Sequence, residues 1–180
     1  GIMKYLLDSG MGDELKQRGF EVTNWKTSIW SVSALIKSPN GVVEIHKDNI
    51  KAGCNVIITN NYYVTPNILK REGIENEFES LTRLAVALAE ESRQGFPEVL
   101  IAGSFPPIET SFRPDLTPSN KVLDDYYSSL GSFIQQKVDL ILCETMGSIR
   151  EGINAAKNAL EFSDRVWLSW TNRGISGDIL

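Results

Sequence analysis

The stretch "VDLILCETMGS", residues Val138–Ser148, carries the pattern that decides the fold. Its first half is nearly all apolar, and a cysteine, a glutamate and a threonine follow. A short apolar run without alternation is typical of a parallel strand that is covered on both faces. A helical stretch begins at Ser148, where Glu151 three residues later makes a capping-box pattern. The segment therefore predicts a buried strand that ends in polar residues and leads into a helix.

The same unit recurs along the chain. Short apolar runs that end in small or polar residues occur at "YLLDSGMG" (5–12), "CNVIITNNYY" (54–63), "EVLIAGSFPP" (98–107) and "RVWLSWTNRG" (165–174). Helical segments separate these runs, so the sequence predicts an α/β fold with a parallel sheet. A doubly wound sheet and a (β/α)8 barrel both fit this alternation.

Helical spacing predicts which side chains the helices bury. The sets that share one face are Phe78, Leu81, Leu84, Ala85 and Leu88 in one helix, and Val122, Tyr126, Leu130 and Phe133 in the next. An earlier helix is expected to break at Pro39-Asn40-Gly41 and to end at Gly53. Gly95 is expected to end the helix that begins near Phe78.

Polar residues follow the predicted strands at the point where each strand ends. They are Asp8, Thr59–Asn61, Ser104, Glu144–Thr145 and Thr171–Asn172. In both candidate folds ligands bind beyond the carboxyl ends of the strands. Ordinary turns also favour Asp, Asn and Ser, but a glutamate directly after a cysteine is not a preferred turn residue. The long loop after the third strand, residues 103–118, is either a lid or a rigid connection.

Composition excludes several classes of protein. The 180 residues are 42% hydrophobic and 23% charged, with a formal net charge of -5, which suits one globular domain. The sequence has no basic stripe of the kind that binds nucleic acid. No apolar run approaches the roughly 20 residues that are needed to cross a membrane. No phosphate-binding loop or dinucleotide fingerprint follows a strand. Two cysteines without an export signal predict a cytoplasmic location.

Residues that could hold a metal are few. The chain has Cys54, Cys143 and His46, whereas a zinc site needs at least three protein ligands that meet in space. We therefore expect no metal site in this chain. His46 lies in the middle of a predicted helix, where a packed histidine is more common than a catalytic base.

Six blocks of the sequence resemble the homocysteine S-methyltransferase family. In order, they are "LLDSGMGDELKQRG", "SIWSVSALIKSP", "VVEIHKDNIKAGCNVIITNNYYVTP", "VLIAGSFPP", "VDLILCETMGSIREG" and "VWLSWTNRGISGD". The resemblance covers essentially the whole chain and implies a (β/α)8 barrel. Residues 1–180 would be the N-terminal portion of that single domain, with about five of its βα units and no separate linker or second domain. The family resemblance implies a methyltransferase that converts the homocysteine thiolate to methionine.

The resemblance also implies substrate-binding residues. Asp8 matches the family aspartate at the end of the first strand and would help to hold the amino acid part of homocysteine. Ser9 stands beside it, where the family usually has glycine, so its side chain adds bulk near the substrate. Thr59 would lie near the substrate carboxylate, and Glu144 would pair with the substrate ammonium.

Two aromatic residues match positions near the family pocket. Trp30 and Tyr63 would offer ring faces on which a sulfur or an onium methyl donor could pack. Simple core packing is the other interpretation of both side chains.

The zinc ligands of the family have no match in this chain. Family members hold zinc with three cysteines in later blocks, and neither Cys54 nor Cys143 matches one of them. Zinc is therefore expected for the complete family enzyme and not for this chain, which we expect to be inactive alone. An open barrel would leave strand edges and apolar helix faces uncovered, which favours self-association.

The implied partners are homocysteine or a related thiol amino acid and a methyl donor of the S-methylmethionine, S-adenosylmethionine or betaine type. One alternative is a shortened, non-catalytic relative that binds a small amino acid or a protein. Another is a barrel enzyme that uses Asp8 and Glu144 as an acid–base pair. The lack of Lys, His or Arg at the predicted strand ends weighs against this last alternative.

Overall fold

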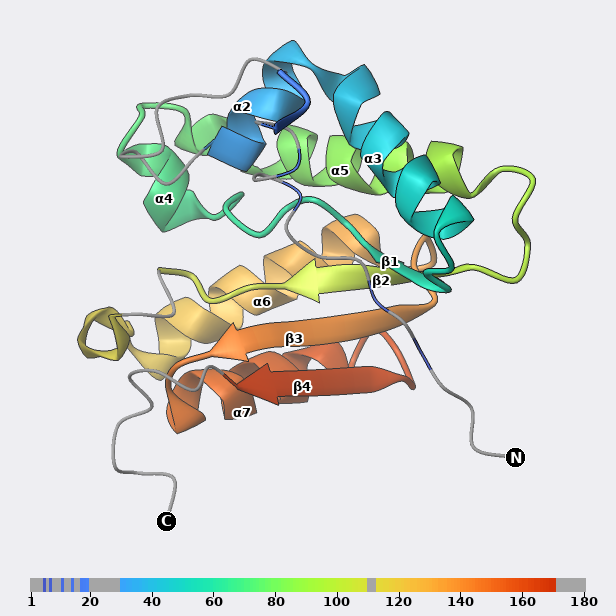
Figure 1. The fold of residues 1–180 in the computed structure, drawn as a ribbon. Helices are drawn as coiled ribbons and strands as arrows, with labels where there is room; N and C mark the ends of the chain where they lie inside the picture. Colours follow the sequence, from blue (N-terminus) through green and yellow to red (C-terminus); the bar gives the residue numbers. More distant parts are fainter. Residues whose placement is uncertain are drawn as a thin grey trace.

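The chain folds around a parallel sheet of four strands (Figure 1). The structure, a computed structural model, describes Tyr5, Leu7, Met11, Glu14 and residues 17–19, 30–109 and 113–170. The strands are β1 (Val56–Ile58), β2 (Leu100–Phe105), β3 (Leu140–Met146) and β4 (Val166–Trp170). All three neighbouring pairs are parallel, which confirms the predicted α/β class.

The strands lie in the sheet in the order in which they occur in the chain, β1-β2-β3-β4. Leu7, from the first predicted strand segment, makes an isolated parallel bridge to Val56 of β1. A doubly wound sheet reverses its strand order partway, whereas a barrel adds each strand beside the one before it. The order observed among the described strands therefore favours the barrel type of winding.

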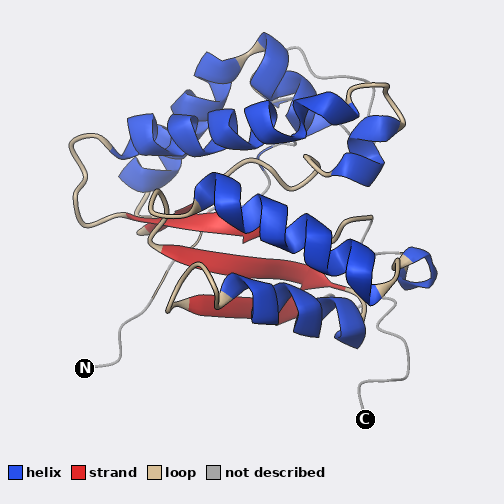
Figure 2. Ribbon diagram, turned by 180° about the vertical axis from the view of Figure 1, so that it is seen from behind, coloured by secondary structure: helices blue, strands red, loops and turns tan. Residues whose placement is uncertain are grey.

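The helices follow the alternation that the sequence predicts. They are α2 (Trp30–Lys37), α3 (Pro39–Lys51), α4 (Pro66–Lys70), α5 (Phe78–Arg93), α6 (Asn120–Ile134) and α7 (Ile149–Ala159), with short 3-10 turns η2 (Glu75–Glu77) and η3 (Pro114–Leu116). Figure 2 shows α6 and α7 lying across one face of the sheet, which we call the helix face. The opposite face, which we call the inner face, has none of the described helices over β3 and β4 (Figure 1). In the described part of the chain, no helix is both long and apolar enough to cross a bilayer.

Side chains alternate between these two faces along each strand. Ile141 and Cys143 of β3 and Phe105 of β2 pack in the cluster with α6 and α7 on the helix face. The inner face holds a separate apolar cluster, whose buried members are Val56, Ala102, Leu140 and Leu142. The residues of β1 to β3 are therefore mostly buried on both faces, as their continuous apolar runs predict.

Two helix predictions need correction. Pro39 does not lie in a break but starts α3, because proline fits the first turn of a helix, and the break is at Ser38. Val122 is 43% exposed in α6, although we predicted it to be buried. The buried face of α6 is instead made by Leu123, Tyr126, Tyr127, Leu130 and Ile134. The buried stripe of α6 therefore starts one residue later than predicted and includes both adjacent tyrosines.

Other helix predictions are confirmed. In α5, Leu81, Ala85 and Leu88 are buried, and Phe78 and Leu84 pack against the same cluster. Gly53 and Gly95 follow α3 and α5 with positive φ angles of 112° and 85°, as expected of glycines that end helices.

Gly131 of α6 lies where α6 meets the chain just after α7. A Cβ atom at this position would lie 2.1 Å from the ring of Phe162, a contact that requires the ring to move. We expect Gly131→Ala to lower the free energy of unfolding by about 1–3 kcal/mol, despite the better helix propensity of alanine. Chemical denaturation measures the change. Ser128→Ala, on the exposed face of the same helix, is the control and should be neutral or slightly stabilising; an equal loss in both variants would contradict the packing argument.

Candidate functional site

The carboxyl edge of the sheet gathers the polar strand-end residues that the structure describes, whereas Asp8, Thr171 and Asn172 lie outside the described residues. The inner face is apolar up to Ala102 in β2 and Leu142 in β3, and the next inward positions are Ser104 and Glu144. Because all four strands are parallel, their carboxyl ends lie at one edge, where the arrowheads of Figure 1 point. The change from apolar to polar on the inner face marks the candidate site.

Ser104 is the centre of the polar contacts at this edge. Its hydroxyl donates to Glu144 Oε2 at 2.5 Å, and its backbone N–H donates to Thr59 Oγ1 at 2.9 Å. Its carbonyl oxygen accepts from Asn61 Nδ2 at 3.1 Å. Ser104 therefore joins the ends of β1, β2 and β3. The sequence identified Ser104 and Asn61 only as strand-end residues. Because Ser104 lies two residues after Ala102, which faces inward, the alternation of the strand could have shown that Ser104 faces inward too.

Thr59 and Glu144, both predicted substrate-binding residues, meet through Ser104 but differ in exposure. Thr59 is 2% exposed, and its hydroxyl also donates to Asn61 Oδ1 at 2.6 Å, so its side chain supports the site from within. Glu144 is half-buried and so remains accessible from solvent. Asp8 and Ser9, the other two predicted substrate-binding residues, lie outside the described residues.

Strand β3 has a bulge directly after Cys143. Cys143 pairs with Leu168 of β4, but the next pair is Met146 with Trp170, so β3 has one extra residue. Thr145 in the bulge has a φ of 51°, a left-handed conformation that is rare for a β-branched residue and costs about 1–3 kcal/mol. Backbone strain of this kind is concentrated at functional sites, and here it lies next to Glu144.

Two side chains hold Thr145 in this conformation. The backbone N–H of Thr145 donates to Ser169 Oγ of β4 at 2.9 Å. The Thr145 hydroxyl donates to the Tyr62 hydroxyl oxygen at 2.7 Å. Sequence reasoning assigned no role to Tyr62 or Ser169, because nothing in the local sequence shows that β3 contains an extra residue.

The two aromatic candidates have different outcomes. Tyr63 is half-buried, packs against the cluster formed by α2, α3 and α5, and contacts the ring of Tyr62 edge-on at 4.8 Å. Its neighbour Tyr62, rather than Tyr63, reaches the bulge. Trp30 is the first residue of α2, and the position of its side chain lies outside what the structure describes.

The possible metal ligands do not come together. Cys54 precedes β1 at the amino edge of the sheet, Cys143 faces the helix layer, and His46 is buried within α3. Burial, with a smaller effect from Glu144, raises the pKa of the Cys143 thiol to about 12, so this thiol stays protonated near neutral pH. Among the described residues no group of three or more His, Cys, Asp or Glu side chains could hold a metal ion.

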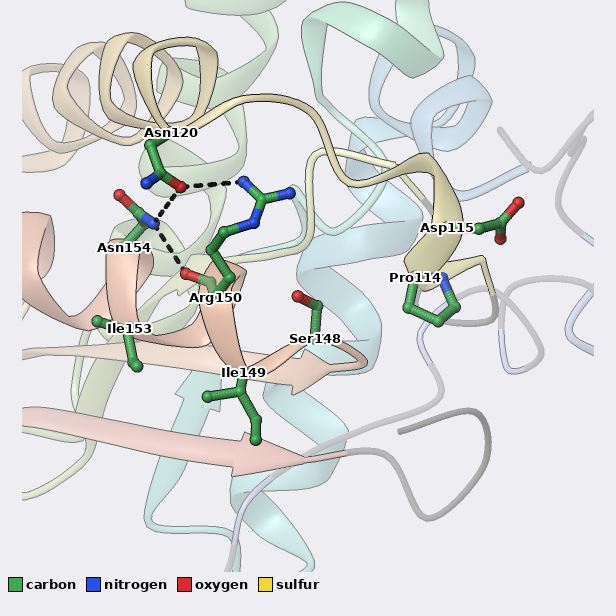
Figure 3. Close-up of a pocket in the computed structure, with 8 residues that line it drawn as sticks. All are labelled: Pro114, Asp115, Asn120, Ser148, Ile149, Arg150, Ile153 and Asn154. Atoms are coloured by element: carbon green, nitrogen blue, oxygen red, sulfur yellow. Dashed lines mark hydrogen bonds between the residues drawn. The ribbon is translucent and has the colours of Figure 1, made fainter. Parts of the chain in front are cut away.

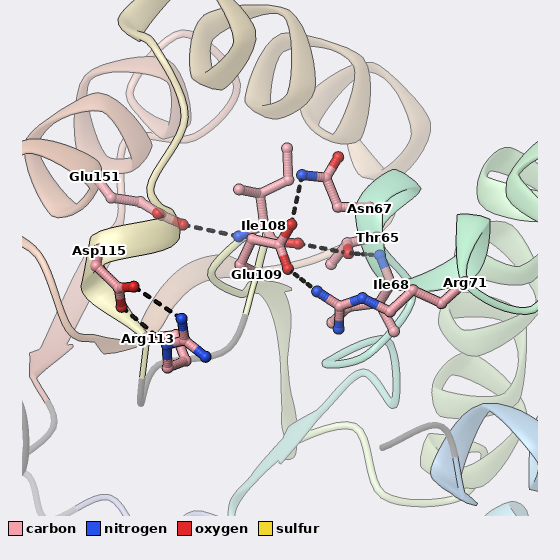
Figure 4. A network of polar contacts seen from close by, with 9 residues as sticks. All are labelled: Thr65, Asn67, Ile68, Arg71, Ile108, Glu109, Arg113, Asp115 and Glu151. Atoms are coloured by element: carbon pink, nitrogen blue, oxygen red, sulfur yellow. Dashed lines mark hydrogen bonds and ion pairs between the residues drawn. The ribbon is translucent and has the colours of Figure 1, made fainter. Parts of the chain in front are cut away.

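The loop that follows Ser104 is held in place by side chains from two helices, α4 with its caps and α7 (Figure 4). Ile108 is fixed on both sides: Thr65, the N-cap of α4, donates to its carbonyl oxygen at 2.7 Å, and Glu151 of α7 accepts from its N–H at 2.8 Å. Glu109 accepts from Asn67 at 2.9 Å and pairs with Arg71. The described start of this loop, residues 106–109, is therefore a rigid connection and not a lid.

Only half of the predicted capping box forms at the start of α7. Ser148 caps α7 by accepting from the Glu151 N–H, as expected. The Glu151 carboxylate, only 4% exposed, turns inward to Ile108 and lies 3.1 Å from the Tyr127 hydroxyl. Burial raises the pKa of this carboxyl above its ordinary value. Tyr127 also lies 3.0 Å from the carbonyl oxygen of Pro106, so its single proton has two acceptors.

A surface groove of about 740 Å³ lies elsewhere, at the start of α7 (Figure 3). Its lining comes from η3, from the start of α6 and from α7, and the Arg150 guanidinium there donates to Asn120 Oδ1 at 3.0 Å. Neither Ser104 nor Glu144 lines this groove. The groove therefore does not extend the candidate site.

Comparison with known proteins finds relatives that are described as methyltransferases. A family model described as homocysteine S-methyltransferase matches residues 5–178. The homocysteine S-methyltransferase of Escherichia coli is 30% identical over 93% of this chain, and YbgG of Bacillus subtilis, also described as a homocysteine S-methyltransferase, is 26% identical over 92%. The chain spans 58% of the length of each of these two relatives.

Solved structures of one relative have the same fold as this chain. The homocysteine methyltransferase MmuM of Escherichia coli in its metallated form superposes with a TM-score of 0.79 at 27% identity, over 94% of this chain and 64% of that one. Its oxidised form gives a TM-score of 0.77 at 26% identity, over 93% of this chain and 61% of that one.

The buried Glu151 carboxyl should make stability depend on pH. From pH 4.5 up to its raised pKa, the folded protein binds more protons than the unfolded chain, so the free energy of unfolding falls as pH rises. Glu151→Gln has the same shape and does not titrate. We expect the wild-type stability, measured relative to this variant by denaturation from about pH 4 to about pH 7, to decrease with pH. A difference that stays constant, or grows with pH, would contradict the raised pKa.

Proposed function

Since this chain belongs to the homocysteine S-methyltransferase family, we propose that its carboxyl-edge site binds homocysteine or a related thiol amino acid for methyl transfer. The observation that supports this proposal best is the half-buried Glu144 carboxylate, held at the edge of the inner face by Ser104. Both curated relatives that match nearly all of this chain are described as homocysteine S-methyltransferases.

Glu144 suits the ammonium group of an amino acid. A carboxylate that is partly removed from water interacts more strongly with a cation than one on the open surface. The hydrogen bond from Ser104 to Oε2 fixes the direction of the carboxylate, so the side chain loses less conformational entropy when a ligand binds. Thr59 contributes by fixing the backbone of Ser104. Asp8 and Ser9 are proposed to complete the amino acid site from the first strand.

The reaction proposed for the complete protein is a nucleophilic displacement. The homocysteine sulfur forms a bond to the donor methyl carbon, while the bond from that carbon to the donor heteroatom breaks and its electron pair leaves with the donor. Donors of the S-methylmethionine, S-adenosylmethionine, betaine or folate type all fit this scheme. In-line positioning of the two substrates is the main requirement on the protein.

Zinc is part of the proposal for the complete enzyme only, where it would lower the pKa of the substrate thiol. The described cysteines and histidine do not fit a zinc site, since they lie on separate parts of the fold. We therefore assign no step of this chain's chemistry to a metal, and we propose that the chain alone is inactive in methyl transfer.

Residues 1–180 are proposed to form the first part of a single barrel domain. The chain spans 58% of its curated relatives, and its described strands follow one another around the sheet. Four side chains beside the last described unit are exposed although apolar, namely Ile153, Leu160, Leu168 and Trp170. Further βα units of a longer chain would cover this apolar surface of α7 and β4, and a chain without them would self-associate there.

A non-catalytic amino acid-binding relative is the second candidate. It is favoured by the separation of Cys54, Cys143 and His46, because binding through Glu144 needs no metal. Calorimetric titration with homocysteine and with methionine separates the two candidates. A site that serves methyl transfer to a thiol should bind homocysteine more tightly than methionine. A general amino acid site should bind the two with equal affinity.

Glu144→Gln should weaken homocysteine binding at least about 30-fold in calorimetric titration, because the substrate ammonium loses a partly buried charge partner. The variant keeps the size of the side chain and its ability to accept from Ser104. Glu79→Gln is the matched control, since Glu79 pairs with Arg83 on the exposed side of α5, and it should leave the affinity unchanged. Equal affinity of wild type and Glu144→Gln would show that Glu144 does not hold the ammonium.

The double substitution Ile153→Lys with Leu160→Lys should reduce self-association of the 180-residue chain, as measured by sedimentation velocity. The side chains of Ile153 in α7 and of Leu160 at its C-cap are 59% and 61% exposed. Ile36→Lys on α2, where the side chain is 54% exposed, is the control and should leave the association unchanged. A wild-type chain that sediments as a monomer at every concentration would contradict the proposed uncovered surface.

A further inference from the structure

We infer that Ser169 and Tyr62 are positioning residues that hold the Glu144–Thr145 bulge and thereby keep Glu144 directed into the site. The inference rests on the proposed function, because it gives Glu144 its role as the group that meets the ligand. Both residues act through the bulge, and neither is proposed to touch the ligand.

The bulge changes which side chains face the site. Cys143 and Met146 both pack in the helix-face cluster, although residues three apart in a regular strand face opposite sides. Because β3 has an extra residue, two consecutive residues, Glu144 and Thr145, make contacts at the carboxyl edge. The side chain of Met146 then packs in the helix layer again. Glu144 meets Ser104 there, and Thr145 meets Tyr62.

The backbone conformation of the bulge needs contacts from outside β3 to stabilise it. Thr145 is β-branched and has a φ of 51°, a backbone conformation that such residues rarely adopt unless their surroundings impose it. The extra residue also interrupts the regular ladder between β3 and β4. Ser169 Oγ compensates by accepting the Thr145 N–H at 2.9 Å from the neighbouring strand.

Tyr62 holds the bulge from the opposite side. It follows β1, and its hydroxyl oxygen accepts from Thr145 Oγ1 at 2.7 Å. The two contacts thus bind the backbone and the side chain of the same strained residue to β4 and to the segment after β1. Release of either contact lets Thr145 relax toward an ordinary φ, which rotates the preceding peptide and turns Glu144 away from Ser104.

Ser169→Ala tests this inference directly in the 180-residue chain. We expect the Thr145 amide hydrogen to exchange about tenfold faster by NMR, because its acceptor is lost. The side-chain carboxyl ¹³C resonance of Glu144 should shift at the same time, since its contact with Ser104 changes. Homocysteine affinity should fall about three- to tenfold. Tyr62→Phe should shift the same Glu144 resonance, and Ser169→Thr, which keeps the hydroxyl, should restore all three values.

The controls remove hydroxyls away from the bulge. Ser163→Ala loses a hydrogen bond in the turn before β4. Tyr5→Phe removes the hydroxyl from a ring that packs on Trp167 near the amino end of the inner face. Both should leave Thr145 exchange and the Glu144 resonance unchanged. If Thr145 exchange and the Glu144 resonance are both unchanged in Ser169→Ala, the inference is overturned. It is also overturned if the wild type binds homocysteine and Ser169→Ala exchanges Thr145 faster but binds homocysteine just as tightly. If the wild-type chain binds no homocysteine, the proposed function fails, and the two NMR readings alone decide whether Ser169 positions Glu144.

Discussion

The alternation of side chains between the two faces of a parallel sheet is the constraint on which this site depends. In β2 and β3 the alternation holds as far as Ser104 and Glu144, so the inner face is apolar through most of its depth and polar at one edge. The bulge at Thr145 then interrupts the alternation, and Met146 returns to the helix layer. One strand therefore supplies a core on both faces and a functional edge within seven residues.

The fold class could be predicted because parallel strands covered on both faces leave continuous apolar runs, as in residues 140–143. The strand order could not be predicted from those runs, since both kinds of winding use the same local unit; it came from the pairing in the sheet. The position of Val122 shows a similar limit. Helical spacing identifies a stripe in α6, but both Val122 and Leu123 fit next to that stripe, and only the packing of the helix shows that Leu123 is the buried one.

The candidate site was predictable to the extent that its residues follow strands in the sequence. Glu144 and Thr59 belong to recognisable blocks, and the structure joins them through Ser104. The roles of Ser169 and Glu151 arise from tertiary contacts that compete with local patterns. The spacing of Ser148 and Glu151 predicts a capping box, yet the carboxylate of Glu151 binds Ile108 from a loop 43 residues away. A buried backbone N–H needs a partner, and that need directs the Glu151 side chain inward.

The sequential strand order has a consequence for how the chain assembles during synthesis. Each described strand pairs with the one made just before it, so every new βα unit meets an edge that already exists. Contacts then form over short distances along the chain, which lowers the entropy cost of closing each loop. Domains synthesised on the ribosome begin to fold from their N-terminal part. This sheet can therefore grow one unit at a time as the polypeptide emerges, with each apolar edge exposed only until the next strand is translated.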